Sequence, residues 1–123
     1  MWEYRARHTS TLDGDTVRLT LDLGFSVRMQ VDVRLLDVHA PELVQPGGLL
    51  VARYVADWMI AAHSSHLVWP LLVRTVQTSK EEPESIRSFT RYVGEVWFAK
   101  NSHSLNDDVR RYLAEHPEWS AGK

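Results

Sequence analysis

The sequence predicts a mainly β fold with helices (α+β), in which five antiparallel strands close into a small barrel and two helices accompany it. Three observations lead to this prediction. Three strand-like segments follow one another directly, one amphipathic helix separates them from two further strands, and a last helix ends the pattern. No strand–helix–strand unit repeats, as a parallel sheet would require, so the order of elements favours an antiparallel barrel of the OB type.

Residue type and alternation predict the first three strands. Residues 2–12 are rich in aromatic and β-branched residues, and the turn sequence Asp-Gly-Asp follows at 13–15. Apolar and polar residues then alternate from Thr16 to Leu23, and again from Val27 to Leu35. Alternation with a period of two is typical of a strand that buries one face, and a short turn between the two runs makes them antiparallel neighbours.

A helix is predicted from about Gly48 to His63, because apolar residues recur there at helical spacing. These apolar residues are Val51, Tyr54, Val55, Trp58, Met59 and Ala62. A second, shorter helix is predicted near the end of the chain. Ser104 is suited to cap its first turn, and Pro117 is expected to end it.

Two more strands are predicted between the helices. Residues 66–76 form the fourth, in which Pro70 favours an edge strand or a bulge. Arg91 to Phe98 form the fifth, in which Gly94 favours a bulge or a sharp bend. The polar segment 77–90 between them is expected to be a mobile loop.

Length and composition fit one domain over residues 1–123, with its core from about residue 4 to residue 116. There is no cysteine, so hydrophobic packing must hold the fold. The N-terminal region lacks the apolar run of a signal peptide or membrane span, which predicts a cytoplasmic protein without a membrane partner. A net charge of −2 argues against a general nucleic-acid coat protein but leaves room for a local arginine site.

Four separated segments resemble the staphylococcal nuclease (thermonuclease-like, SNase-like) family in order and spacing. They read LDGDTVRLTLDLG, VRLLDVHAPE, TRYVGEVW and SLND, and the resemblance extends from about Tyr4 to Leu113. It implies an OB-fold barrel and a metal-dependent endonuclease, a phosphodiesterase that hydrolyses single-stranded or frayed DNA or RNA with little sequence specificity. Compact members of this family occur in bacteria and phages.

The resemblance also implies roles for individual residues. Asp15 matches an aspartate that ligates calcium, and Ala40 stands where a backbone carbonyl faces the metal. Arg34 and Arg91 match two arginines that contact the scissile phosphate. Glu42 matches a glutamate that positions or deprotonates the attacking water.

Phosphodiester chemistry gives these residue types a physical reason. Hydrolysis builds negative charge on the non-bridging oxygens, which planar guanidinium groups bind more strongly in the transition state. A divalent cation neutralises the phosphate further, and a glutamate can hold water in line for attack. Taken singly, each residue also has a structural interpretation, as a turn former or a solvated charge. Their joint occurrence at the spacing of the family favours a site.

His39 is the main departure from the family pattern, because it stands where a second acidic metal ligand is typical. A neutral imidazole removes one ligand charge, so calcium should bind less tightly, and Asp15 with His39 could recruit manganese or another transition ion instead. A protonated His39 would act as a third cation near the phosphate. Phe89, beside Arg91, is a candidate for stacking on a base. An OB-fold module that binds nucleic acid or a protein partner without turnover is the alternative to the enzyme.

Overall fold

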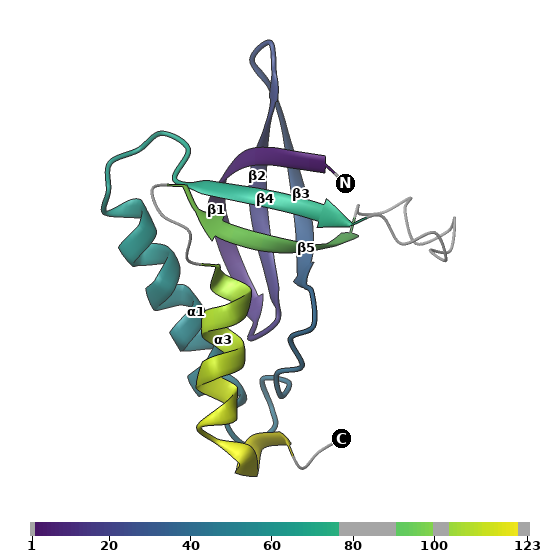
Figure 1. The fold of residues 1–123 in the computed structure, drawn as a ribbon, viewed down its shortest axis with the longest axis vertical. Coiled ribbons are helices and arrows are strands. Elements are labelled where there is room, and N and C mark those ends of the chain that lie inside the picture. The colour runs from purple at the N-terminus through teal and green to yellow at the C-terminus, as the bar shows by residue number, and fades with distance from the viewer. Residues whose placement is uncertain (1, 77–90, 100–103, 121–123) are drawn as a thin grey trace.

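The computed structural model describes residues 2–76, 91–99 and 104–120, in which five strands close into a barrel and two α-helices lie beside it (Figure 1). The predicted fold class is confirmed. The elements are β1 (Trp2–Asp13), β2 (Thr16–Gly24), β3 (Val27–Leu35), α1 (Gly48–His63), β4 (Leu71–Val76), β5 (Arg91–Phe98), α3 (Leu105–Ala114) and the short 3-10 helix η1 (Pro117–Ser120).

The strands follow the order β1-β2-β3-β5-β4 around the barrel. Four pairings are antiparallel, and the fifth, between β3 and β5, is parallel. The parallel pairing arises because α1 and β4 intervene between the two strands, so that the chain returns before β5 begins. The expectation of a wholly antiparallel barrel is corrected at this one pairing, where the barrel closes.

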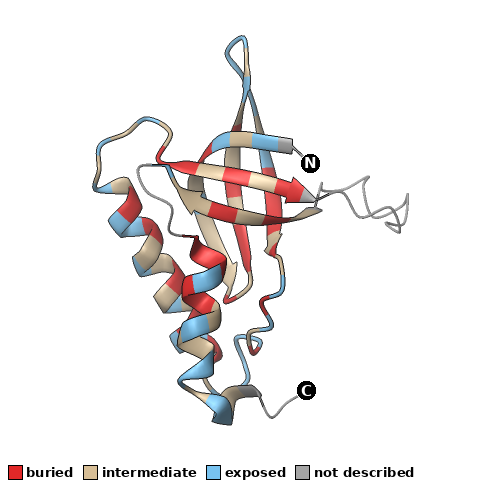
Figure 2. Cartoon of the chain, in the orientation of Figure 1, coloured by how far each residue is buried: buried red, intermediate tan, exposed pale blue. Residues whose placement is uncertain are grey.

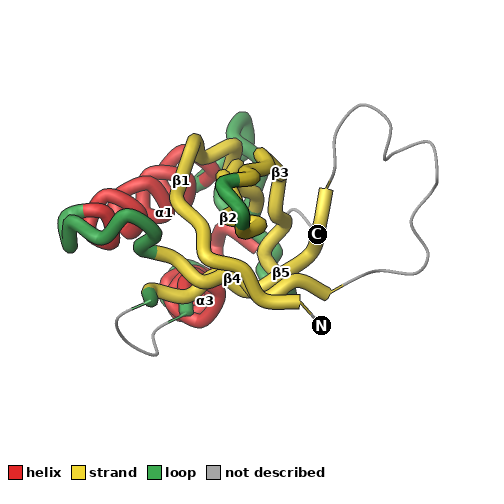
Figure 3. Tube along the Cα trace, turned by 90° about the horizontal axis from the view of Figure 1, so that it is seen from above, coloured by secondary structure: helices red, strands yellow, loops and turns green. Residues whose placement is uncertain are grey.

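Buried residues alternate with less buried ones along the strands, and both helices carry buried residues that belong to the same core (Figure 2). Helix α1 packs against β1 and α3, and α3 packs against β5 (Figure 3). Burial of one large aliphatic side chain stabilises a fold by about 1.5–3 kcal/mol relative to exposure, so this interior is the main source of stability. Its fully buried members include Val17, Leu19, Val33, Leu35, Val51, Val55, Met59, Leu71, Val73 and Leu105.

The fourth strand is shorter than the sequence predicts. It begins at Leu71, and Pro70 lies just before it, with its carbonyl oxygen accepting a hydrogen bond from the Ala99 N–H at 2.8 Å. Strand β4 pairs with both β1 and β5, so it is not an edge strand. Proline is compatible with this closed ladder because it lies outside the paired residues.

Gly94 marks a close approach of two strands. Of the two features predicted here, the bulge is absent, and the sharp bend stays a prediction. The register of Gly94 with β3 and with β4 is continuous. A Cβ atom at this position would lie 2.7 Å from the carbonyl oxygen of Arg74, so any larger residue would push β4 and β5 apart. The register shifts of β1 against β2 lie between His8 and Ser10 and between Thr11 and Asp13.

Both predicted helices are present. Helix α1 has the predicted bounds, and the residue before it, Gly47, has a left-handed backbone with φ of 84°. Helix α3 begins after Ser104, whose hydroxyl oxygen accepts a hydrogen bond from the Asp107 N–H at 2.9 Å, as the capping prediction requires. It ends at Ala114, ahead of Pro117. Within the described residues, no helix has the length and apolar character needed to cross a bilayer.

Candidate active site

A cavity of about 360 Å³ lies where the β1–β2 turn meets the segment that follows β3. Five residues that the sequence predicts for a site line this cavity, although they come from separate segments of the chain. They are Asp15, Arg34, His39, Ala40 and Glu42. Asp13 and Thr16 complete the lining. The structure therefore brings these predicted residues to one place, while their roles stay predictions.

Strand register positions the acidic and the basic parts of the cavity. Thr16, the first residue of β2, pairs with Arg34 near the end of β3. The backbone carbonyl of Asp15 accepts a hydrogen bond from the Leu35 N–H at 2.8 Å. The Asp-Gly-Asp turn is thus fixed beside the end of β3, which sets the aspartate next to the arginine.

Gly14 allows the turn to lie close to the rest of the fold. A Cβ atom here would lie 2.6 Å from Cγ1 of Val51 on α1 and 2.7 Å from Cβ of Ala40. Real side chains do not approach so closely, so glycine is required sterically in the middle of this turn. The sequence suggested only turn chemistry for the Asp-Gly pair, because the packing partners lie far away along the chain.

The Asp15 carboxylate has partners on both of its oxygens. The Thr16 hydroxyl donates to Oδ1 at 3.2 Å, and the Ala40 N–H donates to Oδ2 at 3.3 Å. Nη2 of Arg34 lies 3.8 Å from the same Oδ2 atom. The Asp15 N–H in turn donates to Oδ1 of Asp13 at 3.0 Å. These contacts hold one carboxylate between an acidic and a basic neighbour.

Burial is the largest cause that raises the pKa of Asp15, to about 6, and the hydrogen bond and charge of Asp13 add to it. The Arg34 charge and the Ala40 N–H oppose the shift but do not cancel it. Burial and a neighbouring carboxyl group both disfavour the charged form of Asp15. At neutral pH the turn therefore concentrates negative charge, which favours a nearby cation.

His39 and Glu42 are exposed at the rim of the cavity. The backbone of Glu42 is fixed, because its N–H donates to the Gln45 side chain at 2.8 Å and its carbonyl accepts from the Gln45 N–H at 2.9 Å. A Cβ atom at Gly48 would lie 1.9 Å from the Glu42 carbonyl oxygen, so the start of α1 closes against this turn. The backbone is held while the carboxylate stays accessible to water.

The second predicted arginine is described only by its backbone. Arg91 is the first residue of β5 and pairs with Asp32, while Val93 pairs with Arg34. Its side chain lies outside the described part of the structure, as does all of Phe89. The predicted phosphate contact and base stacking of these two residues stay predictions.

Asp13 and Thr16 are cavity residues to which the sequence assigned no part in the site, and Asp13 was expected only to form the turn. Together with Asp15 it offers two carboxylates of the hard-oxygen type that suits calcium or manganese. A cation between the two carboxylates would offset the burial and the Asp13 contacts that raise the pKa of Asp15. Among residues 2–76, 91–99 and 104–120, no three His, Cys, Asp or Glu side chains form a metal-binding group. The chemistry of the acidic pair fits a divalent ion, but its ligand set is small.

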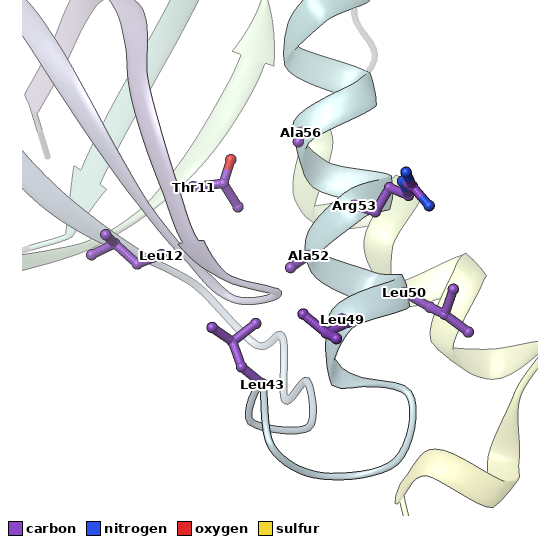
Figure 4. Close-up of a pocket in the computed structure, with 8 residues that line it drawn as sticks. All are labelled: Thr11, Leu12, Leu43, Leu49, Leu50, Ala52, Arg53 and Ala56. Atoms are coloured by element: carbon purple, nitrogen blue, oxygen red, sulfur yellow. The ribbon is translucent and has the colours of Figure 1, made fainter.

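A second, apolar cavity of about 550 Å³ lies between the end of β1, α1 and the residue after Glu42 (Figure 4). It is lined by Thr11, Leu12, Leu43, Leu49, Leu50, Ala52, Arg53 and Ala56. The sequence did not predict this cavity. Leu49, on the first turn of α1, is 70% exposed. Helix α1 therefore presents apolar surface beside the candidate site.

The fold and the cavity define a small OB-like barrel with acidic and basic side chains gathered at one end. In comparisons with known proteins, the chain matches no protein-family model and no curated protein. Membership of the staphylococcal nuclease family stays a prediction from the four sequence segments.

Proposed function

We propose that this protein is a metal-dependent nuclease that hydrolyses DNA or RNA with little sequence specificity. One observation carries the proposal: Asp15, Arg34 and Glu42, from three separate segments, line a single cavity. A phosphodiester needs a cationic group for its oxygens and an acceptor for the attacking water. This cavity offers both, beside an acidic pair that suits a cation.

Arg34 is the group that would bind phosphate. Its side chain is 43% exposed, and its contact with Asp15 is 3.8 Å long, so its donors remain accessible to an incoming anion. Planar guanidinium groups can make two parallel hydrogen bonds to a phosphate. As charge grows on the non-bridging oxygens, these bonds strengthen and lower the barrier.

Glu42 is the group that would hold and deprotonate water. An oxygen–phosphorus bond forms from that water, one phosphorus–oxygen ester bond breaks, and the leaving oxygen takes up a proton. A divalent cation held by Asp13 and Asp15 would supply further charge neutralisation on the phosphate. His39 at the rim would adjust which ion is preferred, because imidazole suits manganese better than calcium.

A second function is favoured by a different observation. In the described part of the chain no three-residue metal-binding group exists, and exposed His39 stands where an acidic ligand is expected. This arrangement suits a barrel that binds nucleic acid, or a protein partner, without cleaving it. The two functions share the barrel and differ in turnover.

A nuclease assay on single-stranded DNA separates them. The purified protein is measured with calcium, with manganese and with chelator, together with Glu42→Gln and the matched control Glu115→Gln, an exposed glutamate at the end of α3. We expect ion-dependent cleavage that Glu42→Gln lowers about 100-fold or more, as for loss of a general base. The control should cleave like wild type.

His39→Asp tests the choice of ion, and we expect it to increase cleavage with calcium relative to manganese. If the wild-type protein binds DNA but fails to cleave it with any of the ions tested, binding without turnover is the function. If Glu42→Gln cleaves as fast as wild type, the proposed site is wrong.

A further inference from the structure

Two arginines lie over the ring of one tryptophan outside the candidate active site, whose cavity lining includes none of the three. The guanidinium carbon of Arg7 on β1 lies 4.8 Å from the ring centroid of Trp69, and that of Arg28 on β3 lies 5.5 Å from the same centroid. Arg5 shares the outward side of β1 with Arg7. We call Arg5, Arg7, Arg28 and Trp69 the arginine–tryptophan surface.

This surface carries excess positive charge although the chain as a whole is acidic. Arg5 forms an ion pair with Asp22 at 2.7 Å. Within the described residues, Arg7 and Arg28 form neither an ion pair nor a hydrogen bond. The pKa of Asp22 is lowered, chiefly by the hydrogen bond from the Gly24 N–H and further by the charges of Arg5 and Arg28. Asp22 therefore stays ionised. Its single negative charge offsets only one of the three positive charges on this surface.

The two guanidinium groups over the Trp69 ring are positioned to bind an anion. A guanidinium that stacks on an aromatic face keeps its N–H donors free at its edge. Holding Arg7 and Arg28 on one ring limits their motion before a ligand arrives, which reduces the entropy lost on binding.

The nearby hairpin tip presents an aromatic ring to solvent. Phe25 is fully exposed and has a left-handed backbone with φ of 54°. Neither feature favours folding, because a left-handed backbone is strained for a residue with a side chain and an exposed ring buries no surface. The tip belongs to the same β2–β3 hairpin that carries Asp22 and Arg28.

The outer face of β3 connects this surface with the candidate site. Arg28, Gln30, Asp32 and Arg34 occupy alternate positions on that strand and so share one side of it. Asp32 is buried there, and its carboxylate is paired with Arg18 at 2.8 Å. Six residue steps of about 3.3 Å each place Arg28 and Arg34 roughly 20 Å apart along the strand. A chain of several nucleotides along this face would reach from the hairpin to the cavity.

We propose that the arginine–tryptophan surface, with Phe25, binds single-stranded nucleic acid and leads it along β3 toward the candidate site. The ligand is a polyanion with planar bases: guanidinium groups bind its phosphates, and a free ring or guanidinium plane stacks on unpaired bases. Binding on this surface does not require cleavage. Only the direction toward the cavity rests on the proposed function.

Fluorescence anisotropy of a labelled oligothymidine about 15 nucleotides long, measured in chelator, tests the surface. We expect Arg7→Gln with Arg28→Gln to weaken binding about tenfold and to reduce the magnitude of the log–log salt dependence by about 1.4, for two phosphate contacts to a single strand. Phe25→Ser should weaken binding at least about threefold through lost stacking. Thermal unfolding verifies that each variant is folded.

Arg74→Gln is the matched control, because Arg74 also lies over a tryptophan, 6.0 Å from the Trp97 centroid, but forms an ion pair with Glu3 at 3.0 Å. It should bind within about twofold of wild type, as expected of a surface ion pair. Unchanged affinity and salt dependence in the double variant would overturn the inference. The inference would also be overturned if heparin and oligothymidine bound equally well and Phe25→Ser had no effect. The surface would then recognise charge alone.

Cleavage of a dinucleotide distinguishes this inference from the proposed function. A dinucleotide is too short to reach the surface from the cavity, so the double variant should cleave it like wild type. If wild type cleaves nothing while the double variant binds oligothymidine more weakly, the surface is supported and the proposed function fails.

Discussion

The Nη2 atom of Arg34 lies 3.8 Å from the Oδ2 atom of Asp15, so the groups proposed for phosphate and for cation are in electrostatic contact. The aspartate side chain is 14% exposed and the arginine side chain 43% exposed. A phosphate can therefore reach the arginine from solvent, whereas the aspartate stays in the turn. Because the Arg34 charge does not cancel the effects of burial and Asp13, the protonation of Asp15 is sensitive to pH near neutrality.

Asp15→Asn should stabilise the protein at neutral pH. The folded-state pKa of about 6 lies above the unfolded value of 3.8, so the folded state binds more protons and stability falls as pH rises from about 4 to about 6. The amide removes the charge but keeps an acceptor oxygen. Allowing for partial solvent screening, we expect a gain of about 1 kcal/mol in unfolding free energy at pH 7.5 and almost none at pH 4, measured by urea denaturation.

Asp22→Asn is the matched control for this experiment, because the pKa of Asp22 is lowered, chiefly by the Gly24 N–H. Its effect should have the opposite sign: a loss of stability at pH 7.5 that disappears at low pH, where the carboxylate is protonated in wild type as well. If Asp15→Asn destabilises the protein at pH 7.5 as Asp22→Asn does, burial and Asp13 do not raise the pKa of Asp15.

Neutral His8 should stabilise the fold, and acid should remove this contribution. Burial, followed by the charge of His63, lowers the pKa of His8. Nε2 of His63 accepts a hydrogen bond from the His8 N–H at 3.3 Å, and its Nδ1 faces the Met59 carbonyl at 3.0 Å. The stabilisation is complete above the unfolded pKa of 6.5 and is lost as pH falls below it through the folded-state value.

Urea denaturation at pH 7.5 and 5.5 tests this prediction. Wild type should lose more stability on acidification than His8→Gln, and His39→Gln, which removes an exposed ring, should resemble wild type. His63→Ala should cost about 1 kcal/mol at pH 7.5 through its lost hydrogen bond. Equal pH dependence in wild type and His8→Gln would contradict the assignment.

The strands could be predicted from the sequence because alternation is a local property. The runs from Thr16 to Leu23 and from Val27 to Leu35 show it, and β2 and β3 have nearly these bounds. The parallel pairing of β3 with β5 could not, because it depends on where α1 and β4 direct the chain. The steric requirement at Gly94 could not be predicted for a related reason, since the Arg74 carbonyl that excludes a side chain belongs to another strand.

The candidate site divides in the same way. The resemblance predicted Asp15, Arg34 and Glu42, which the fold brings to one cavity. Thr16 and the steric role of Gly14 emerged only in three dimensions, because the hydroxyl contact and the neighbouring Ala40 depend on the folded turn. Residue type predicts chemistry, whereas contacts between distant segments require the fold.

Asn106→Ala should destabilise the protein by about 3 kcal/mol. Asn106 is fully buried at the start of α3, and its side chain accepts from the Val96 N–H at 3.0 Å and donates to the Leu36 and Gly94 carbonyls at 3.1 Å each. Alanine leaves the buried N–H without its acceptor. Urea denaturation measures the loss, and Asp107→Asn, at an exposed position in the same turn, should change stability by no more than about 0.5 kcal/mol.

Asn106→Asp sharpens the test, because it keeps an acceptor for the Val96 N–H but directs a carboxylate at two carbonyl oxygens. It should be more destabilising than alanine at pH 7.5 and recover at pH 4.5, where protonation restores a donor. A pH-independent loss would mean that the side chain turns away from these carbonyls.

Gly14→Ala should disturb the fold and the candidate site together. The added methyl would lie 2.6 Å from Cγ1 of Val51 and 2.7 Å from Cβ of Ala40, and a Cβ atom cannot move without its backbone. Overpacking of this kind costs about 1–3 kcal/mol. Displacing Ala40 would also weaken the hydrogen bond from its N–H to Asp15, so cleavage should fall by more than the folded fraction alone explains.

Gly24→Ala is the control. The φ of 88° at this position strains an alanine, but nothing lies within 4 Å of the added Cβ atom. Stability should therefore fall by about 1 kcal/mol, while cleavage per folded molecule stays unchanged. If Gly14→Ala has the urea midpoint and the cleavage rate of wild type, the turn is not packed against α1 and Ala40 as the structure describes.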